Sequence, residues 1–106
     1  MASKTKLEQA AWEALELVYD PELDLDIVNL GLIYEVRTTE TDIHVIATLT
    51  TMGCPAQDEI EAAMLEELCA IDGVDNIKVE WTFTPPWTPD RLTEFGRDCL
   101  LSMGFL

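Results

Sequence analysis

The residues best suited to chemistry lie in segment 48–55, which ends in a Gly-Cys-Pro motif. The pattern predicts a strand that turns into a helix, with Cys54 at the helix N-cap and Pro55 at the first helical position, where proline is favoured. A thiol there faces unpaired backbone N–H groups and the positive end of the helix dipole, and both stabilise the thiolate that binds metals. Gly53 allows the tight turn before it. The alternative is a buried structural cysteine.

Five other residues have side chains that could do chemistry. Asp20 either ends the first helix through an Asx-type turn or supplies a functional carboxylate. Trp87 follows two prolines and either pins the last helix to the core or docks a partner. Cys69 and Cys99 fall on or beside apolar helix stripes, so we expect small core residues. The single histidine, His44, is expected on a polar strand face, so we predict no Cys–His catalytic pair and no catalytic residue.

The charge and the cysteine count exclude several classes of protein. The 106 residues carry a net charge of −15, and residues 7–36 hold eight acidic side chains and no basic one. Such a surface excludes nucleic-acid binding and favours basic partners or cations, although it also fits a merely solvated face. The three cysteines form no Cys-x-x-Cys pair, which argues against a disulfide framework or a zinc module. With no signal sequence and no apolar run of ~18 residues, we expect a cytoplasmic protein that binds no membrane.

Hydrophobic periodicity predicts six elements. Each strand alternates between apolar and polar residues, and each helix carries an apolar stripe. In order, we expect a helix ending near residue 19, a turn-rich stretch over 23–31, strands over 32–37 and 42–50, a helix over 55–70 and a strand over 76–83. Thr88 then caps a last helix that begins at Pro89 and runs to about residue 103.

Clean alternation indicates a sheet with helices on one face only, because a sheet covered on both faces would show continuous apolar runs. We therefore predict a single α/β domain over residues 1–106, a two-layer sandwich in the order α-β-β-α-β-α with a three-stranded mixed sheet. The second face is either in water or paired with another protein, which leaves a homodimer open. It carries His44, Ile46, Thr48, Lys78, Glu80 and Thr82.

The predicted topology gathers three segments at one edge of the sheet. The first two strands form an antiparallel hairpin, and the strand-helix-strand unit that follows is parallel by strong preference. The start of the first strand therefore lies beside the ends of the other two. We expect segments 20–31, 50–55 and 84–88 to converge there, where sites form in open α/β sheets.

Taken together, four motifs resemble the MIP18 family, also called the DUF59 domain. The resemblance covers about residues 8–103 and implies the fold of the iron–sulfur cluster assembly domain. By that resemblance, Cys54 matches the family's reactive cysteine, and Asp20, Glu22, Thr51 and Trp87 match other signature positions. The motifs are Asp-Pro-Glu-Leu at 20–23, the run at 26–34, Thr-Leu-Thr-Thr-Met-Gly-Cys-Pro at 48–55, and Pro-Pro-Trp-Thr-Pro-Asp-Arg at 85–91.

The resemblance implies an accessory factor that helps to deliver clusters or iron to client proteins, with no tightly bound cofactor. Cys54 would hold iron or a cluster transiently; clusters usually take four thiolates, so a second subunit or external thiols must supply the rest. Expected partners are an assembly scaffold or client proteins. The alternatives are a non-catalytic interaction module or an accessory protein of a phenylacetyl-CoA-type ring oxygenase. Two departures from the family pattern bear on these alternatives. The branch that serves the ring oxygenase carries a cysteine-rich C-terminal module that this sequence lacks. Many relatives have an acidic residue before the Pro-Pro-Trp motif, where this chain has Thr84.

Overall fold

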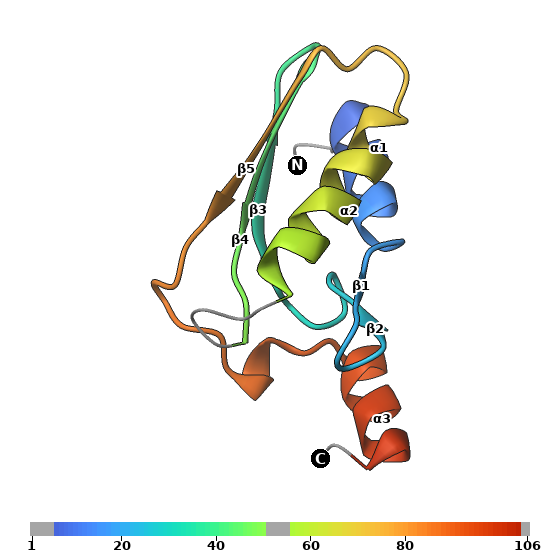
Figure 1. Cartoon of the computed structure of the whole chain (residues 1–106), viewed down its shortest axis with the longest axis vertical. Helices are drawn as coiled ribbons and strands as arrows, with labels where there is room; N and C mark the ends of the chain where they lie inside the picture. Colours follow the sequence, from blue (N-terminus) through green and yellow to red (C-terminus); the bar gives the residue numbers. More distant parts are fainter. Residues whose placement is uncertain (1–5, 51–55, 105–106) are drawn as a thin grey trace, which may run out of the picture.

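The computed structural model describes residues 6–50 and 56–104 (Figure 1). Its regular elements follow the predicted order, with a short two-stranded ribbon and a 3₁₀ turn added. They are α1 (Lys6–Leu15), β1 (Tyr19–Asp20), β2 (Leu25–Asp26), β3 (Ile33–Thr38), β4 (Asp42–Ala47), α2 (Gln57–Cys69), β5 (Asn76–Trp81), η1 (Pro89–Arg91) and α3 (Glu94–Met103).

The main sheet has the strand order β3-β4-β5. Strands β3 and β4 pair antiparallel, with Val36 opposite Val45, and β4 pairs parallel with β5, with Val45 opposite Val79. The parallel pair arises because α2 carries the chain back between them. The mixed three-stranded sheet is therefore confirmed.

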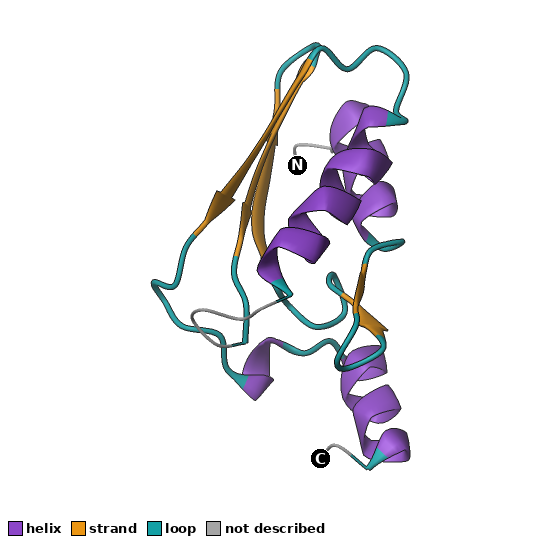
Figure 2. Ribbon diagram, in the orientation of Figure 1, coloured by secondary structure: helices purple, strands orange, loops and turns teal. Residues whose placement is uncertain are grey.

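Helices α1 and α2 lie on one face of this sheet, as predicted (Figure 2). The inward positions of β4 are fully buried, as the alternation in the sequence requires. The two helices meet them with apolar stripes at helical spacing. These buried side chains are Ala11 and Leu15 of α1, Ile43, Val45 and Ala47 of β4, and Ile60, Met64 and Leu68 of α2.

The opposite face of the sheet carries polar side chains. Among residues 6–50 and 56–104 no helix or strand covers it (Figure 1). His44 and Glu80 pair across this face at 3.0 Å between Nε2 and Oε1. The prediction that Thr48 lies on this polar face was wrong, because its side chain is fully buried. Strand β4 already ends at Ala47, so the alternation no longer applies one residue later.

The start of β3 differs from the predicted alternation. Alternation over the predicted strand 32–37 would point Leu32, Tyr34 and Val36 inward, but Leu32 and Ile33 are both buried while Tyr34 is half-buried. The pairing with β4 shifts between Ile33 and Glu35, which is the signature of a bulge. The extra residue changes which side chains face the helices.

The first helix is shorter than predicted. It ends at Leu15, and the chain then forms an antiparallel ribbon in which Tyr19 lies opposite Asp26. The Asp20 carboxylate explains the reversal, because one oxygen accepts the backbone N–H groups of Glu22 at 2.7 Å and Leu23 at 3.1 Å. Such an Asx-type turn competes with helix formation.

The predicted last helix is also divided. Residues 89–91 form the 3₁₀ turn η1, and α3 begins only after Thr93, whose hydroxyl accepts the Gly96 N–H at 3.0 Å as an N-cap. Helix α3 lies beyond the end of the sheet, next to the ribbon (Figure 1). A side chain at Gly96 would meet the Asn29 carbonyl oxygen at 2.5 Å, which shows how closely α3 approaches that loop.

Candidate functional site

The start of β3 and the ends of β4 and β5 lie side by side at the same end of the sheet, which is where segments 20–31 and 84–88 were predicted to converge. The Thr48 N–H donates to the Leu32 carbonyl at 2.8 Å, just before β3 begins. The Thr82 N–H donates to the Ala47 carbonyl at 2.8 Å, just after β5 ends. The described parts of the convergent segments therefore lie side by side.

Residues 85–93 are fastened to the turn at residues 29–31, and we call the two segments together the clasp. The Trp87 indole N–H donates to the Leu30 carbonyl at 2.7 Å, and the Arg91 Nε–H donates to the Gly31 carbonyl at 2.9 Å. The Arg91 guanidinium also stacks 4.0 Å from the centre of the Tyr34 ring. The Trp87 indole and the Arg91 guanidinium therefore hold residues 85–93 against the turn at 29–31.

Gly31 is required at the centre of the clasp. Its φ is +75°, a conformation that other residues adopt only with strain. An added Cβ would lie 2.1 Å from the Arg91 carbonyl oxygen, which is an impossible contact. The turn at 29–31, part of the turn-rich stretch predicted over 23–31, is confirmed as a turn.

Asn29 connects the clasp to the ribbon. Its backbone N–H and side-chain amide both donate to the Asp26 carboxylate, at 2.9 Å and 2.7 Å. Its side-chain oxygen accepts the Thr93 hydroxyl, and its carbonyl accepts the Thr93 N–H at 3.0 Å. Asp26 is buried, so this network fixes a charged group away from water.

Two of the predicted site residues in this region, Asp20 and Trp87, make hydrogen bonds that hold the fold together. Asp20 is buried, and its carboxylate forms the turn that contains the exposed Glu22. Trp87 is half-buried, packs against the core and uses its indole N–H inside the clasp. The hydrogen bond from Trp87 to the Leu30 carbonyl therefore supports the alternative in which Trp87 holds its segment against the core.

Cys54, Thr51 and Gly53 lie outside the described residues, so their roles stay predictions. Helix α2 begins at Gln57, with Ala56 at the N-cap position and the first helical bond running from the Ile60 N–H to the Ala56 carbonyl at 2.9 Å. The predicted boundary was two residues too early. The N-cap position that we expected for Cys54 is therefore corrected to Ala56.

The other candidate side chains lie apart from the clasp. Cys69 is exposed, which corrects the expected core position: it is the last residue of α2 and falls off the stripe that contains Leu68. Cys99 is half-buried and packs against the core, as expected. His44 is engaged with Glu80 on the open sheet face. Within residues 6–50 and 56–104, no three His, Cys, Asp or Glu side chains gather where they could hold a metal ion.

Sequence reasoning assigned no role to several residues that build the clasp. Arg91, Tyr34 and Thr93 act through contacts with residues about 50 or more positions away, for which a single sequence gives no signal. Asp26 and Asn29 did leave a signal, because a carboxylate three residues before an asparagine is typical of an Asx-type turn.

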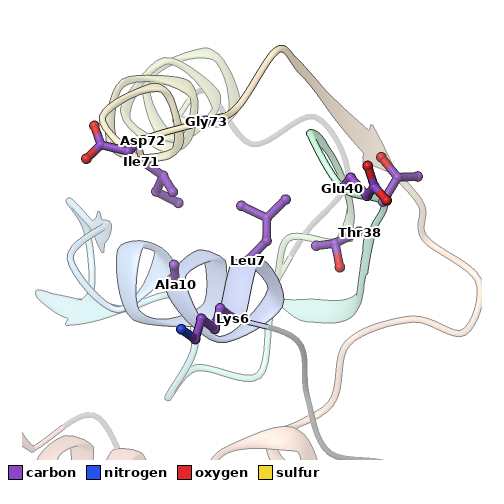
Figure 3. Close-up of a pocket in the computed structure, with 9 residues that line it drawn as sticks. Lys6, Leu7, Ala10, Thr38, Glu40, Ile71, Asp72 and Gly73 are labelled. Atoms are coloured by element: carbon purple, nitrogen blue, oxygen red, sulfur yellow. The ribbon is translucent and has the colours of Figure 1, made fainter.

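A hollow of about 600 Å³ lies at the other end of the sheet (Figure 3). The start of α1, the turn after β3 and the loop after α2 form its walls, and Lys6, Glu40 and Asp72 are its charged residues. No cysteine or histidine is among the described residues that line it. These residues therefore offer no thiolate or imidazole ligand for a metal ion.

The sequence is similar to a known protein family and to characterised members of it. Residues 8–81 match a family model described as iron-sulfur cluster assembly protein. The chain is 39% identical over 95 residues to the Fe-S protein maturation auxiliary factor YitW of Bacillus subtilis, a match that covers 89% of this chain and 93% of that protein. It is 36% identical over 85 residues to the Fe-S protein maturation auxiliary factor SufT of Staphylococcus aureus, covering 79% and 97%.

A solved structure has the same fold. The crystal structure of a DUF59 domain of unknown function from Bacillus anthracis superposes with a TM-score of 0.84 and 31% sequence identity, covering 94% of this chain and 93% of that one. Within the described residues, no helix is long and apolar enough to cross a membrane.

Proposed function

The chain belongs to the iron–sulfur cluster assembly protein family, as its motifs predicted, and from this premise we propose that it is an auxiliary factor in the maturation of iron–sulfur proteins. The observation that carries the proposal is the 39% identity to an auxiliary factor of that kind over nearly the full length of both chains. The matched family region, residues 8–81, runs from α1 to the end of β5 and so includes the sheet, both covering helices and the Gly-Cys-Pro motif.

The proposed cargo is iron or an iron–sulfur cluster, and Cys54 is the proposed ligand. One thiolate leaves most positions of a cluster unfilled, since clusters usually take four such ligands. A scaffold protein, a client protein or a second copy must supply the others, so binding is transient and completed by a partner. The chain's charge of −15 supports a preference for cations and for partners with basic surfaces.

We infer a non-catalytic role for the protein, acting as one domain in the cytoplasm. Thiol catalysis commonly uses a histidine base beside the nucleophile. The chain's single histidine is engaged with Glu80 on the open sheet face, at the side of the sheet opposite the helices. The clasp has a positioning role in this proposal: it fixes residues 85–93, including Trp87, at the edge where β4 ends and the chain continues toward Cys54. Asp20 and Glu22 shape the neighbouring turn.

The test replaces the native protein in its host with Cys54→Ser and assays an iron–sulfur enzyme. Serine keeps the size of cysteine but is a poor ligand for iron in a cluster. We expect that enzyme's activity to stay as low as in the depleted cells, while the variant accumulates to the normal level. Full restoration of activity would show that the thiol is dispensable and would favour the non-catalytic interaction module.

Cys69→Ser and Cys99→Ser are the matched controls, because the same atom is exchanged on α2 and α3. Both should restore the activity of the client enzyme. If all three variants failed equally, the defect would be a general loss of thiols and would count against a special role for Cys54.

A further inference from the structure

The exposed apolar side chains of this protein are concentrated in one region. In the described part of the chain, the large apolar residues that are most exposed are Leu17 and Tyr19 near β1, and Phe95, Leu101 and Met103 on α3. Tyr19 is 55% exposed, Phe95 61% and Met103 43%. These three line one groove of about 430 Å³ between the ribbon and α3. Single exposed apolar residues are ordinary, but a shared groove indicates a contact surface.

The geometry of α3 explains why this surface is left open. Gly96 and Leu100 form its buried stripe, against the loop at Asn29 and the ribbon. Phe95, Cys99 and Met103 follow one another at a spacing of four residues, so they form a second stripe along the helix. Cys99, in the middle of this stripe, is half-buried and also packs against the core, whereas Phe95 and Met103 on either side of it are exposed along the groove. Helix α3 therefore has a second apolar side that is only partly packed.

The charges around the groove select the kind of partner. Its charged lining residues are Asp24, Asp26 and Asp98, and none of the lysines or arginines that the structure describes lines it. Asp26 is buried and committed to Asn29, whereas Asp24 and Asp98 are exposed at the rim. A second copy would bring the same acidic rim and a further charge of −15, which disfavours self-association. A basic partner meets complementary charge.

We propose that this groove binds an amphipathic, basic helical segment of another protein. Two or three apolar side chains of the segment enter between Tyr19 and Phe95, and its lysines or arginines pair with Asp24 and Asp98. The argument for this surface uses only Tyr19, Asp24 and residues 95–103, and none of it depends on Cys54, so the inference goes beyond the proposed cargo role and can fail without affecting it.

The test titrates the full chain, labelled with ¹⁵N, with a synthetic helical peptide of leucine and lysine. The peptide has about 18 residues, enough for five helical turns, with its leucines on one side. A control peptide has the same composition with the leucines spread around the helix. NMR locates the bound peptide, and fluorescence anisotropy gives the affinity. We expect amide shifts confined to residues 19–26 and 95–103, and binding about tenfold tighter than for the control peptide.

Four variants separate the groove from general attraction. Phe95→Ser should weaken binding about tenfold and Asp98→Lys several-fold, with the Asp98 effect decreasing as salt rises. Leu101→Ser removes an equally exposed side chain of α3 that does not line the groove, and Asp72→Lys makes the same charge change at the other end of the sheet. These two controls should bind as the native chain does.

Four results would overturn the proposal. Equal binding of both peptides, or equal weakening by Asp72→Lys and Asp98→Lys, would mean that only net charge is recognised. Shifts that map elsewhere would place the contact on another surface. Self-association of the free chain that Phe95→Ser abolishes would show that a second copy occupies the groove.

Discussion

In the part of the molecule formed by α1, α2 and β3–β5, which we call the sheet half, the buried side chains are apolar and come from α1, α2, β3 and β4, with half-buried apolar residues of β5 packed against them. In the clasp, the groups that meet are an indole, a guanidinium and a hydroxyl on one side and backbone or amide oxygens on the other. Apolar burial is non-directional and proportional to area, whereas each hydrogen bond needs one donor at one place. The two regions therefore differ in what they require of the sequence.

This difference predicts that substitutions in the two regions destabilise the protein in different ways. The sheet half should tolerate exchanges that keep volume and lose stability globally when volume is removed. The clasp should be sensitive to single polar groups, and its loss should release one end of the molecule while the sheet persists. Substitutions in the two regions can be compared directly, because denaturation reports the whole fold and hydrogen exchange reports each amide.

The largest expected effect is in the sheet half. Met64→Ala removes a fully buried side chain of α2 and should lower the free energy of unfolding by about 2–5 kcal/mol, measured by urea denaturation. The exposed Glu66→Ala on the same helix should change it by less than about 0.5 kcal/mol. A small effect at Met64 would mean that the contact between α2 and the sheet is not what holds this half.

The next effect is at Gly31. Gly31→Ala adds both a strained φ and a collision with the Arg91 carbonyl, and we expect a loss of about 2–4 kcal/mol together with faster exchange of the Thr93 amide. Gly73→Ala is the control: its φ of +85° is equally strained, but nothing lies within 4 Å, so it should cost about 1 kcal/mol. Equal losses at the two glycines would remove the argument for a close approach in the clasp.

The smallest effect compares two tryptophans. Trp87→Phe leaves the buried Leu30 carbonyl without its donor and should lower the free energy of unfolding by about 1–3 kcal/mol. Trp81→Phe removes an indole bond to Glu61, a half-buried carboxylate that water can reach, so we expect less than about 1 kcal/mol. Thermal or urea unfolding of the two variants checks the order. The reverse order would indicate that the clasp contributes less than the surface of the sheet.

The comparison also explains which parts of the fold could be predicted from the sequence. The alternation of β4 and the stripe of α2 are local patterns, and they identified the strand, the helix and the parallel partner strand β5. The ribbon at β1–β2 was missed because the Asp20 carboxylate, and not an apolar pattern, reverses the chain there. The predicted last helix ends at Met103 as expected but begins five residues later than Pro89, for a similar reason: Thr93, its N-cap, is bonded to Asn29, a contact that no local pattern encodes.

The candidate site was predictable to the same degree. Topology alone brought segments 20–31 and 84–88 together, because it depends only on strand directions. The contacts inside the clasp depend on side chains such as Arg91 that find their partners only after the strands have assembled. The assignment of Cys54 came from the motif and the resemblance, and it stays a prediction.

The clasp has a consequence for the order in which the protein is made. Trp87 follows Leu30 by 57 residues and Arg91 follows Gly31 by 60, so the turn at 29–31 is synthesised long before its partners. Chains emerge from the ribosome with the N-terminal end first and begin to fold as they do so. The turn at 29–31 therefore leaves the ribosome without the partners of its carbonyl groups, and the clasp can close only after residues 85–93 have followed it.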